Sequence, residues 1–362
     1  MRAATSGACS INKGTTLRIA FFINDLEREY AGYTTTVLAH QAAMRGHDVC
    51  YLTPEDFVLR PDDSLAVHAR VMPKKKYADR AEFFATLCSN KCKVEAIDVA
   101  DVDVLMLRND PSIDFERGWA MEVGVLFGRE AAKRGTIVLN DPDSLGRAIN
   151  KLYFQSFPVE ARAETLISKN DDDIKAFAKE HGTIILKPLQ GSGGTGVFKV
   201  DSKSASNLNQ MIEAIGRDGY IIAQAFVPAA KKGDIRLFVM NGVPLAIDGK
   251  YAALRRVAAK DDIRSNIHAG GTAEPVEIGE AELKVAETIR PKLVADGMFL
   301  VGVDIVGDKI LEVNVFSPGN LKSCSDLAGV DFSIPIIESI ERKVEIRKQY
   351  GGVFDNRHLA VL

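Results

Sequence analysis

The sequence is poor in the features that mark secreted, membrane and nucleic-acid-binding proteins. It has five cysteines, an odd number scattered along 362 residues, which fits reduced thiols better than a disulfide framework. No run approaches the ~18 consecutive apolar residues of a membrane span. With a net charge of -3 and a pI near 6.1, the chain lacks the excess of basic residues that is typical of nucleic-acid-binding proteins. We therefore expect a cytoplasmic protein with neither a membrane nor a nucleic-acid partner.

The sequence also lacks a targeting signal and a strong cysteine metal site. Residues 1–16 have no apolar segment and little arginine, so we expect a disordered leader and no targeting signal. Cys88 and Cys92 could share a helical face, but two thiols without a second pair make a weak metal site, and incidental or buried thiols are the better interpretation. No convincing Ser-His-Asp or Cys-His arrangement is present.

What the chain does contain is a 46% apolar fraction, enough for substantial cores, and an alternation of strand-like and helical periods in its first third. This pattern predicts an open α/β domain over residues 17–140. The loop at 24–32 lacks the G-x-G-x-x-G spacing of dinucleotide folds, so no nicotinamide site is expected. The predicted elements are strands at 17–23, 48–52, 102–108 and 136–139, with helices at about 33–45 and 115–134.

A glycine-rich stretch, KPLQGSGGTG, lies between two strand-like runs within residues 183–200. Walker and dinucleotide loops instead join a strand to a helix. The tip of a glycine-rich hairpin can bring exposed backbone N–H groups into contact with a triphosphate. Lys187, beside this tip, would add a positive point charge that binds phosphate. The alternative is a flexible surface turn. Lys151 is predicted on the helix that follows the Asn140-Asp-Pro turn.

A second informative stretch, residues 299–318, alternates apolar and polar positions on both sides of Gly307-Asp308, which predicts a β-hairpin. Apolar rows of Val301, Val303 and Ile305 and of Leu311, Val313 and Val315 must share one face. A two-residue loop would separate them, so we expect a three-residue loop at 307–309, with a bulge. Asp304 then lies opposite Glu312, with Asn314 two residues along. This oxygen-rich face suits Mg²⁺ beside a nucleotide, or is simply a solvated sheet face.

Several charged residues occupy positions that suit substrate contacts. Arg108 leaves a buried strand into a loop, which fits either a substrate carboxylate or a surface position. Asp234 and Arg236 share one face of a strand that pairs with a strand from 244 to about 256 through an Asn-Gly turn. Residues 256–271, which hold Arg256 and Arg264 and directly follow Arg255, have no clear period, which favours an active-site lid over a linker. Further predicted elements are strands at 164–168 and 220–227, helices at 171–180, 280–295 and 333–348, and a loose tail at 351–362.

Several segments of the chain carry a resemblance to a known family: LRIAFFIN, LMLRNDP, NDPDSLGRAINKLYF, TIILKPLQGSGG, IIAQAFVPAAKKGDIRLF, IRSNIHAGG and VGVDIVGDKILEVNVFSP. From about residue 17 to 343, the sequence resembles the prokaryotic glutathione synthetases of the ATP-grasp superfamily. The resemblance implies an α/β protein with an ATP-grasp fold preceded by an open α/β, or pre-ATP-grasp, domain. Its implied parts are the substrate-binding domain 17–140, a lid subdomain 141–225, a catalytic subdomain 226–350 and the tail 351–362.

The resemblance also implies site residues, cofactors and a reaction. ATP and Mg²⁺, or Mn²⁺, would be the cofactors, and γ-glutamylcysteine and glycine would be joined through an acyl phosphate by a homo-oligomeric enzyme. The implied metal ligands are Asp304, Glu312 and Asn314. The implied catalytic residues are Arg236, Arg256, Arg264 and Asn266. The implied substrate contacts are Arg108, Ser317, Pro318 and Gly319. The implied nucleotide contacts are Lys151, Lys187, Gly191, Ser192, Gly193, Gly194, Gln224, Ala225, Phe226, Val227 and Asp234.

Two departures from the family pattern leave the exact substrates open: Asn109 stands where the family commonly has lysine, and Lys322 where an arginine follows the Ser-Pro pair. His268 also stands where alanine is usual, and we interpret it as a solvated histidine of the predicted lid. One alternative is an ATP-grasp ligase for another acid and amine, as the altered residues 317–322 would allow. A second is a synapsin-like nucleotide-binding protein without ligase chemistry, against which the complete set of implied ligands argues.

Overall fold

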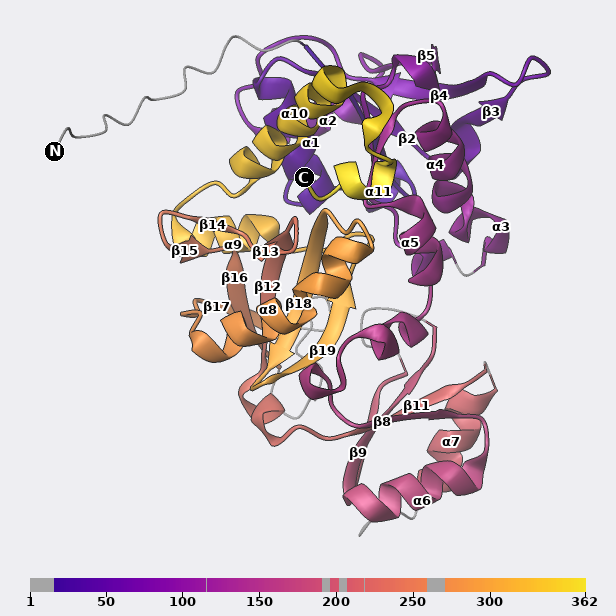
Figure 1. Ribbon diagram of the computed structural model, residues 1–362, viewed down its shortest axis with the longest axis vertical. Coiled ribbons are helices and arrows are strands. Elements are labelled where there is room, and N and C mark those ends of the chain that lie inside the picture. The colour runs from indigo at the N-terminus through magenta and orange to yellow at the C-terminus, as the bar shows by residue number, and fades with distance from the viewer. Residues whose placement is uncertain (1–15, 115, 191–195, 202–206, 218, 259–270) are drawn as a thin grey trace, which may run out of the picture.

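The computed structural model describes residues 16–114, 116–190, 196–201, 207–217, 219–258 and 271–362. The chain forms three stacked parts: an N-terminal α/β domain, a central sheet built from the C-terminal half, and a small sheet at the opposite end from the N-terminal domain (Figure 1). Within the described residues, no helix combines the length and the apolar character needed to cross a membrane.

The N-terminal domain confirms the predicted open α/β arrangement. Its core is a parallel run of strands in the order β2-β1-β6-β7, which is buried on both faces. The strands β3, β4 and β5 form an antiparallel extension that was not predicted. The extension joins the parallel strands where β4 pairs with β2. The elements are β1 (Arg18–Phe22), α1 (Thr34–Met44), β2 (Asp48–Leu52), β3 (Phe57–Leu59), β4 (Leu65–Val71), α2 (Arg80–Leu87), β5 (Lys93–Asp98), β6 (Val104–Leu107) and β7 (Ile137–Leu139).

The single long helix predicted at 115–134 is wrong. The segment divides into the 3-10 turn η4 (Pro111–Asp114), a short α3 (Gly118–Met121) and α4 (Val123–Lys133). Tertiary contacts account for the break, because Asp114 accepts from Asn24 at 2.6 Å and pairs with Arg117 at 2.6 Å. The bond to Asn24 fixes the start of the segment to the loop after β1.

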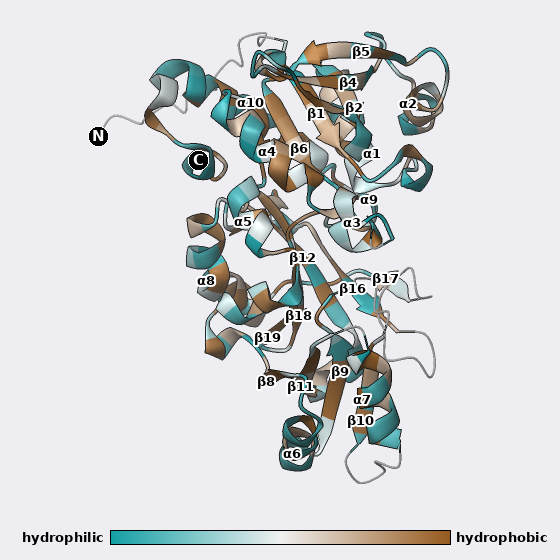
Figure 2. Cartoon of the chain, turned by 90° about the vertical axis from the view of Figure 1, so that its right-hand side faces the viewer, coloured by the Kyte–Doolittle hydropathy of each residue, from teal (hydrophilic) through white to brown (hydrophobic). Residues whose placement is uncertain are grey.

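The small sheet has the strand order β10-β9-β11-β8 and its own hydrophobic core under two helices. The glycine-rich segment lies between β9 and β10, which pair antiparallel, so the predicted hairpin context is confirmed. In Figure 2, α6 is coloured mostly as hydrophilic residues. The elements are β8 (Thr165–Ser168), α6 (Asp171–His181), β9 (Thr183–Pro188), β10 (Phe198–Asp201), α7 (Leu208–Gly216) and β11 (Ile221–Ala225).

The central sheet has the order β17-β16-β12-β18-β19, with β13 paired to β12. The strand predicted from 244 to 256 is divided, because a small β14-β15 hairpin interrupts it. The elements are β12 (Asp234–Met240), β13 (Val243–Pro244), β14 (Ala246–Ile247), β15 (Lys250–Tyr251), β16 (Ala253–Val257), β17 (Thr272–Glu274), α8 (Glu280–Ala295), β18 (Leu300–Val306) and β19 (Lys309–Asn314).

The β18-β19 hairpin confirms the predicted register at its centre but not at its tip. Asp304 pairs with Glu312, whereas Val306 pairs with Lys309, so the turn has two residues and the three-residue loop is wrong. The extra residue is Leu311, which forms a bulge because Ile305 pairs with Ile310. Ile310 is therefore the core residue of this row, and Leu311 lines a cavity.

The C-terminal segment packs back onto the N-terminal domain. Helix α10 (Ser333–Tyr350) follows α9 (Leu321–Ala328) and shares a hydrophobic cluster with α1 (Figure 1). Residues 351–362 are not the predicted loose tail, because α11 (Asn356–Leu359) buries Leu359. The Asn356 side chain donates to Val138 O at 2.9 Å and accepts from Val138 N at 2.8 Å, which covers the edge of β7.

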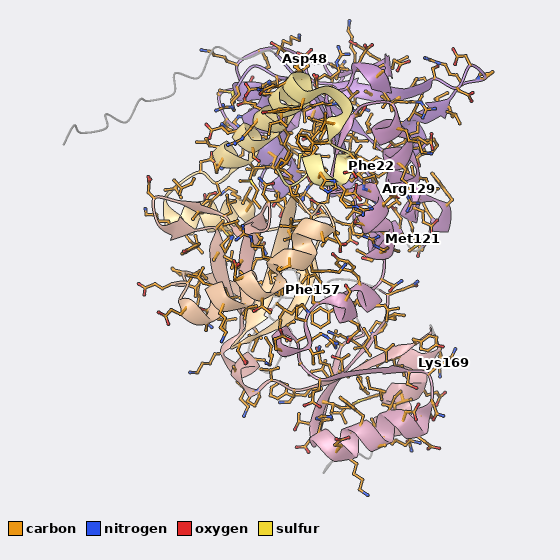
Figure 3. All side chains as sticks on the ribbon, in the orientation of Figure 1. Phe22, Asp48, Met121, Arg129, Phe157 and Lys169 are labelled. Atoms are coloured by element: carbon orange, nitrogen blue, oxygen red, sulfur yellow. The ribbon has the colours of Figure 1, made fainter. Side chains whose placement is uncertain are left out.

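The N-terminal domain and the central sheet share one hydrophobic core. Phe22 of β1, Phe157 of the connecting segment and Val303 of β18 belong to the same buried cluster, and Figure 3 labels the first two. The small sheet has a separate core. The predicted boundary at residue 140 therefore falls inside a shared core, and the small sheet is the part with the most independent packing.

Asn140 joins these two parts through buried hydrogen bonds. Its Nδ2 donates to Leu300 O at 3.1 Å and to Val315 O, and its Oδ1 accepts from Leu300 N at 2.9 Å. We expect Asn140→Ala to lower the free energy of unfolding by about 2–4 kcal/mol, because it leaves buried backbone groups without partners. Urea unfolding would measure this change. The control is Asn209→Ala on the exposed face of α7, expected to shift stability by less than about 0.5 kcal/mol. An equal shift in the two variants would contradict the assignment.

Candidate functional site

A cavity lies where the three parts of the molecule meet. Each part contributes lining residues, so the cavity cannot be assigned to a single domain. The residues relevant to the chemistry are Asp110 and Ser112 of the N-terminal domain, Lys151 and Phe154 of the connecting segment, Lys187 and Gln224 of the small sheet, and Glu312, Asn314 and Ser317 of the central part.

Lys187 is held in this cavity by its neighbours on the small sheet. Its Nζ donates to Gln224 Oε1 at 3.2 Å, and Gln224 Nε2 donates to Thr165 Oγ1 at 3.1 Å. The ammonium also lies 5.9 Å from the ring centroid of Phe154. Gln224 is 3% exposed and lines the cavity, where its side chain orients the lysine, and its predicted nucleotide contact stays a prediction.

A second lysine and a carboxylate complete the charge pattern of the cavity. Lys151 begins the 3-10 helix η5 (Lys151–Ser156), and not the preceding α5 (Pro142–Arg147) on which we predicted it, because α5 ends before Lys151. Burial lowers the pKa of Lys151, and burial lowers the pKa of Lys187 to about 8, while the Glu312 carboxylate opposes both shifts. Two desolvated ammonium groups around one carboxylate favour an anionic ligand accompanied by a cation.

Next to this group, a buried network of four charges crosses the central sheet. The register of β12 places Arg236 opposite Asp304 and Asp234 opposite Arg256. Arg256 donates to both oxygens of Asp234 at 2.7 Å and lies 2.6 Å from Asp304 Oδ2. Arg236 binds both oxygens of Asp304, with Nη2 at 3.0 Å from Oδ2. Each of the four side chains is no more than 7% exposed.

The electrostatics of this network depend on Asp304. Burial alone would raise the pKa of Asp304, but the guanidinium groups of Arg236 and Arg256 hold that pKa below its usual value. The carboxylate is therefore ionised at neutral pH and neutralised by two arginines. Asp234, which we predicted to contact nucleotide, is instead the bidentate partner of Arg256; its predicted nucleotide role stays a prediction.

The donor set of the predicted metal site fits a hard cation. Asp304 and Glu312 are cross-strand partners, and Asn314 Nδ2 lies 3.4 Å from Asp304 Oδ2. Two carboxylates and one amide oxygen are typical ligands of Mg²⁺. Among the described residues, no three His, Cys, Asp or Glu side chains gather as a separate metal cluster. A cation at this site would compete with the two arginines for Asp304.

Arg108 lies beneath the segment after β19 and does not line the cavity. It is 3% exposed, and Nη2 donates to Pro318 O at 3.1 Å. Ser317 does line the cavity, and its Oγ is buried with no hydrogen-bond partner among the described residues. Pro318 packs on Gly302, where an added Cβ would lie 2.9 Å from the Pro318 Cβ. The substrate roles predicted for Arg108, Ser317, Pro318 and Gly319 remain predictions.

The remaining predicted residues fall into two groups. The backbone N–H groups of Ala225 and Phe226 bind Glu164 O and Thr183 O, at 2.9 and 3.1 Å, so the predicted adenine contact of residues 224–227 must use other atoms. Val227 O accepts from Ala230 N. A second group, together with the lid predicted around it and His268, lies outside the described residues: Gly191, Ser192, Gly193, Gly194, Arg264 and Asn266.

Several cavity residues were not singled out from the sequence. Phe154 lies in the segment NDPDSLGRAINKLYF, and Asp110 lies two residues after Arg108 in LMLRNDP, so the sequence offered a signal for both residues. Thr165 carried no local signal, because its importance arises from the pairing of β8 with β11, which sets Thr165 against Gln224.

The fold places the protein in a known class. A D-cycloserine synthetase superposes with a TM-score of 0.58 at 15% identity, covering 89% of this chain and 99% of that chain. D-alanyl-alanine synthetase A from Vibrio cholerae gives 0.55 at 13% identity, covering 92% and 99%. The ATP-grasp ligase PsnB gives 0.54 at 16% identity, covering 90% and 98%. The fold is thus the predicted ATP-grasp fold behind an open α/β domain.

The sequence comparisons define the family. A family model described as prokaryotic glutathione synthetase, N-terminal domain, matches residues 17–146, and one for the ATP-grasp domain of the same enzymes matches 150–329. The chain therefore belongs to the prokaryotic glutathione synthetase family, as predicted. Glutathione synthetase from Vibrio vulnificus is 32% identical over 307 residues, covering 84% of this chain and 91% of that protein. The one from Rhodopseudomonas palustris is 33% identical over 332 residues, covering 91% and 99%.

Proposed function

We propose that the protein joins γ-glutamylcysteine to glycine with ATP, giving glutathione, ADP and phosphate. The observation that carries this proposal is the family match across both domains, 17–146 and 150–329, which meet around one cavity. That cavity combines desolvated lysines, a carboxylate and an amide, as a phosphoryl-transfer site requires. A non-catalytic, synapsin-like protein is not favoured by these relatives.

The chain's own residues would act mainly by positioning and charge. Lys151 and Lys187 would bind ATP phosphates, and a divalent cation, Mg²⁺ or Mn²⁺, held by Asp304, Glu312 and Asn314 would offset phosphate charge when bound. The cysteinyl carboxylate oxygen attacks the γ-phosphorus, the bond from that phosphorus to the bridging oxygen of ADP breaks, and an acyl phosphate forms. The glycine amine then attacks the acyl carbon, phosphate leaves and the amine loses a proton.

Two sets of residues would serve the acyl substrate and the amine. Arg236 and Arg256, with Arg264 and Asn266, would stabilise charge on the transferred phosphoryl group and the acyl carbon. The carboxylate of glycine needs a cation, a hydroxyl or backbone N–H groups, which residues 317–322 could supply. Lys322 keeps the positive charge of the family's arginine but lacks the bidentate donor geometry of a guanidinium. The Lys322 ammonium is paired with the Asp326 carboxylate. We also propose a cytoplasmic homo-oligomer.

The test is ADP formation by the purified protein with γ-glutamylcysteine and a panel of amines: glycine, alanine, serine and β-alanine. Turnover that requires both γ-glutamylcysteine and glycine would support the proposal, with a raised KM for glycine as the expected effect of Lys322. Absent turnover with every amine of the panel, combined with robust turnover of another acid, would reject glutathione synthesis and leave a ligase for a different pair.

The Lys187 pKa predicts how nucleotide affinity depends on pH. A phosphate binds the ammonium form, so binding should weaken as pH rises above about 8, where free Lys187 loses its proton. The decline approaches tenfold per pH unit for each ammonium group that titrates. Lys187→Arg stays charged over this range and should remove most of the decline between about pH 7.5 and 9.5. Lys151 titrates in the same direction and would account for a residual slope.

Calorimetry with ADP at a series of pH values would measure this effect without turnover. The matched control is Lys169→Arg, because Lys169 is an exposed lysine directly after β8, labelled in Figure 3, that does not line the cavity. It should reproduce the wild-type slope. A Lys187→Arg slope equal to that of the wild type would show that Lys187 does not bind phosphate.

A further inference from the structure

The segment after β19, residues 316–321, is held by the N-terminal domain. Arg108, at the end of β6, donates from Nη1 to Phe316 O at 3.4 Å and from Nη2 to Pro318 O at 3.1 Å. Its Nε donates to Thr35 Oγ1 at 3.3 Å, and Thr34 Oγ1 accepts from Leu321 N at 3.3 Å. Two residues at the start of α1 and one after β6 thus fix both ends of this segment.

The central sheet fixes the same segment from the other side. Arg236 Nη1 donates to Gly319 O at 3.3 Å. Gly302 of β18 leaves only enough room for Pro318, since a Cβ there would lie 2.9 Å from the proline and 3.0 Å from Arg236 Cδ. The backbone carbonyls of Phe316, Pro318 and Gly319 therefore accept from arginines, while the Ser317 side chain lines the cavity. The segment has little freedom to shift unless one of these contacts is lost.

Arg108 has the properties of a fixed structural cation. Burial lowers its pKa to about 10, so the guanidinium is still charged at neutral pH. Its donors are directed at backbone carbonyls and a threonine hydroxyl, and it does not belong to the cavity lining. A substrate carboxylate in the cavity would therefore meet Phe316 and Ser317, which line it, before it met Arg108.

We propose that Arg108 is a positioning residue for the amine substrate, which it serves through residues 316–321, and not a ligand of the acid substrate. This inference rests on the proposed function, because it needs a carboxylate-bearing amine at Ser317. It predicts that disturbing Arg108 or its threonine partners alters recognition of glycine, while binding of ATP and γ-glutamylcysteine is conserved. A misplacement of about 1 Å near reacting groups is enough for a large loss of rate.

The experiment measures KM for glycine, γ-glutamylcysteine and ATP in the wild type, Arg108→Lys and Thr35→Val. We expect the KM for glycine to rise about tenfold in Arg108→Lys and less in Thr35→Val, because a lysine cannot bridge both carbonyls. The other two KM values should change less than about twofold. Thermal unfolding monitors integrity, and Thr35→Val decides the question if Arg108→Lys fails to fold.

Hydroxylamine supplies a second readout, because it attacks acyl phosphates but has no carboxylate to be positioned. Its rate should be the same in the wild type and the variants, which a general loss of structure would not produce. A rise in KM for γ-glutamylcysteine, equal losses with hydroxylamine and glycine, or unchanged KM for glycine would overturn the inference. A wild type inactive with γ-glutamylcysteine and either acceptor would instead refute the proposed function.

Discussion

Glu312→Gln is expected to lose at least about a thousandfold in turnover while its unfolding midpoint stays within a few degrees of the wild type. Glu312 is partly exposed in the cavity and has no ion pair within 4.0 Å among the described residues, so little packing is lost. The variant removes one of the two carboxylates of the predicted cation site and the anion that offsets Lys151 and Lys187.

A metal-binding measurement distinguishes the role of Glu312 as a predicted cation ligand from its role as the counter-charge of Lys151 and Lys187. Titration of Mn²⁺ in the presence of ADP should show weaker binding in Glu312→Gln, independent of any activity measurement. Asp308→Asn is the matched control, because Asp308 lies at the exposed turn of the same hairpin, and it should behave as the wild type. Near-normal turnover by Glu312→Gln at saturating Mg²⁺ would falsify the metal assignment.

The centre of this hairpin could be predicted, but its tip could not. Alternation of apolar and polar residues requires Asp304, Glu312 and Asn314 to share a face, and burial of the opposite face makes any other register costly. The same requirement is met by a three-residue loop or by a bulge further along. Placing the bulge at Leu311 depends on how Ile310 packs in the shared core, and that is not visible in a local pattern.

The charged network shows a second limit of sequence reasoning. The alternation within β12 predicted that Asp234 and Arg236 share a face, and the structure confirms it. Their partners depend on strand order, since β12 pairs with both β16 and β18. Arg236 therefore meets Asp304 and Arg256 meets Asp234 across more than 20 intervening residues, and no period encodes such a pairing.

Docking of the C-terminal segment was missed for the same reason. Residues 351–362 have no clear helical or strand period, so the pattern favoured a tail. Their order comes from Asn356, whose amide pairs with the backbone of Val138 at the edge of β7, and from burial of Leu359. A single polar side chain that completes a sheet edge has no signature until the sheet is known.

Asp304→Asn is expected to abolish turnover and also to lower the free energy of unfolding by about 3–5 kcal/mol, because it leaves a buried guanidinium without its counter-charge. This differs from Glu312→Gln, since Asp304 is 1% exposed and binds two arginines. Arg256 keeps Asp234 as a bidentate partner in the variant. In this variant, Arg236 is therefore the guanidinium that is left without a counter-charge.

The double variant Asp304→Asn with Arg236→Met should recover most of the lost stability, to within about 2 kcal/mol of the wild type, because it removes the orphaned charge and fills the space with an apolar chain. Turnover should stay absent, since a predicted cation ligand and a predicted catalytic arginine are both missing. Urea unfolding of the wild type, both single variants and the double variant forms a cycle that measures this coupling. Additive losses in the cycle would mean that Arg236 and Asp304 do not stabilise each other, and recovered turnover would mean that neither residue takes part in the reaction.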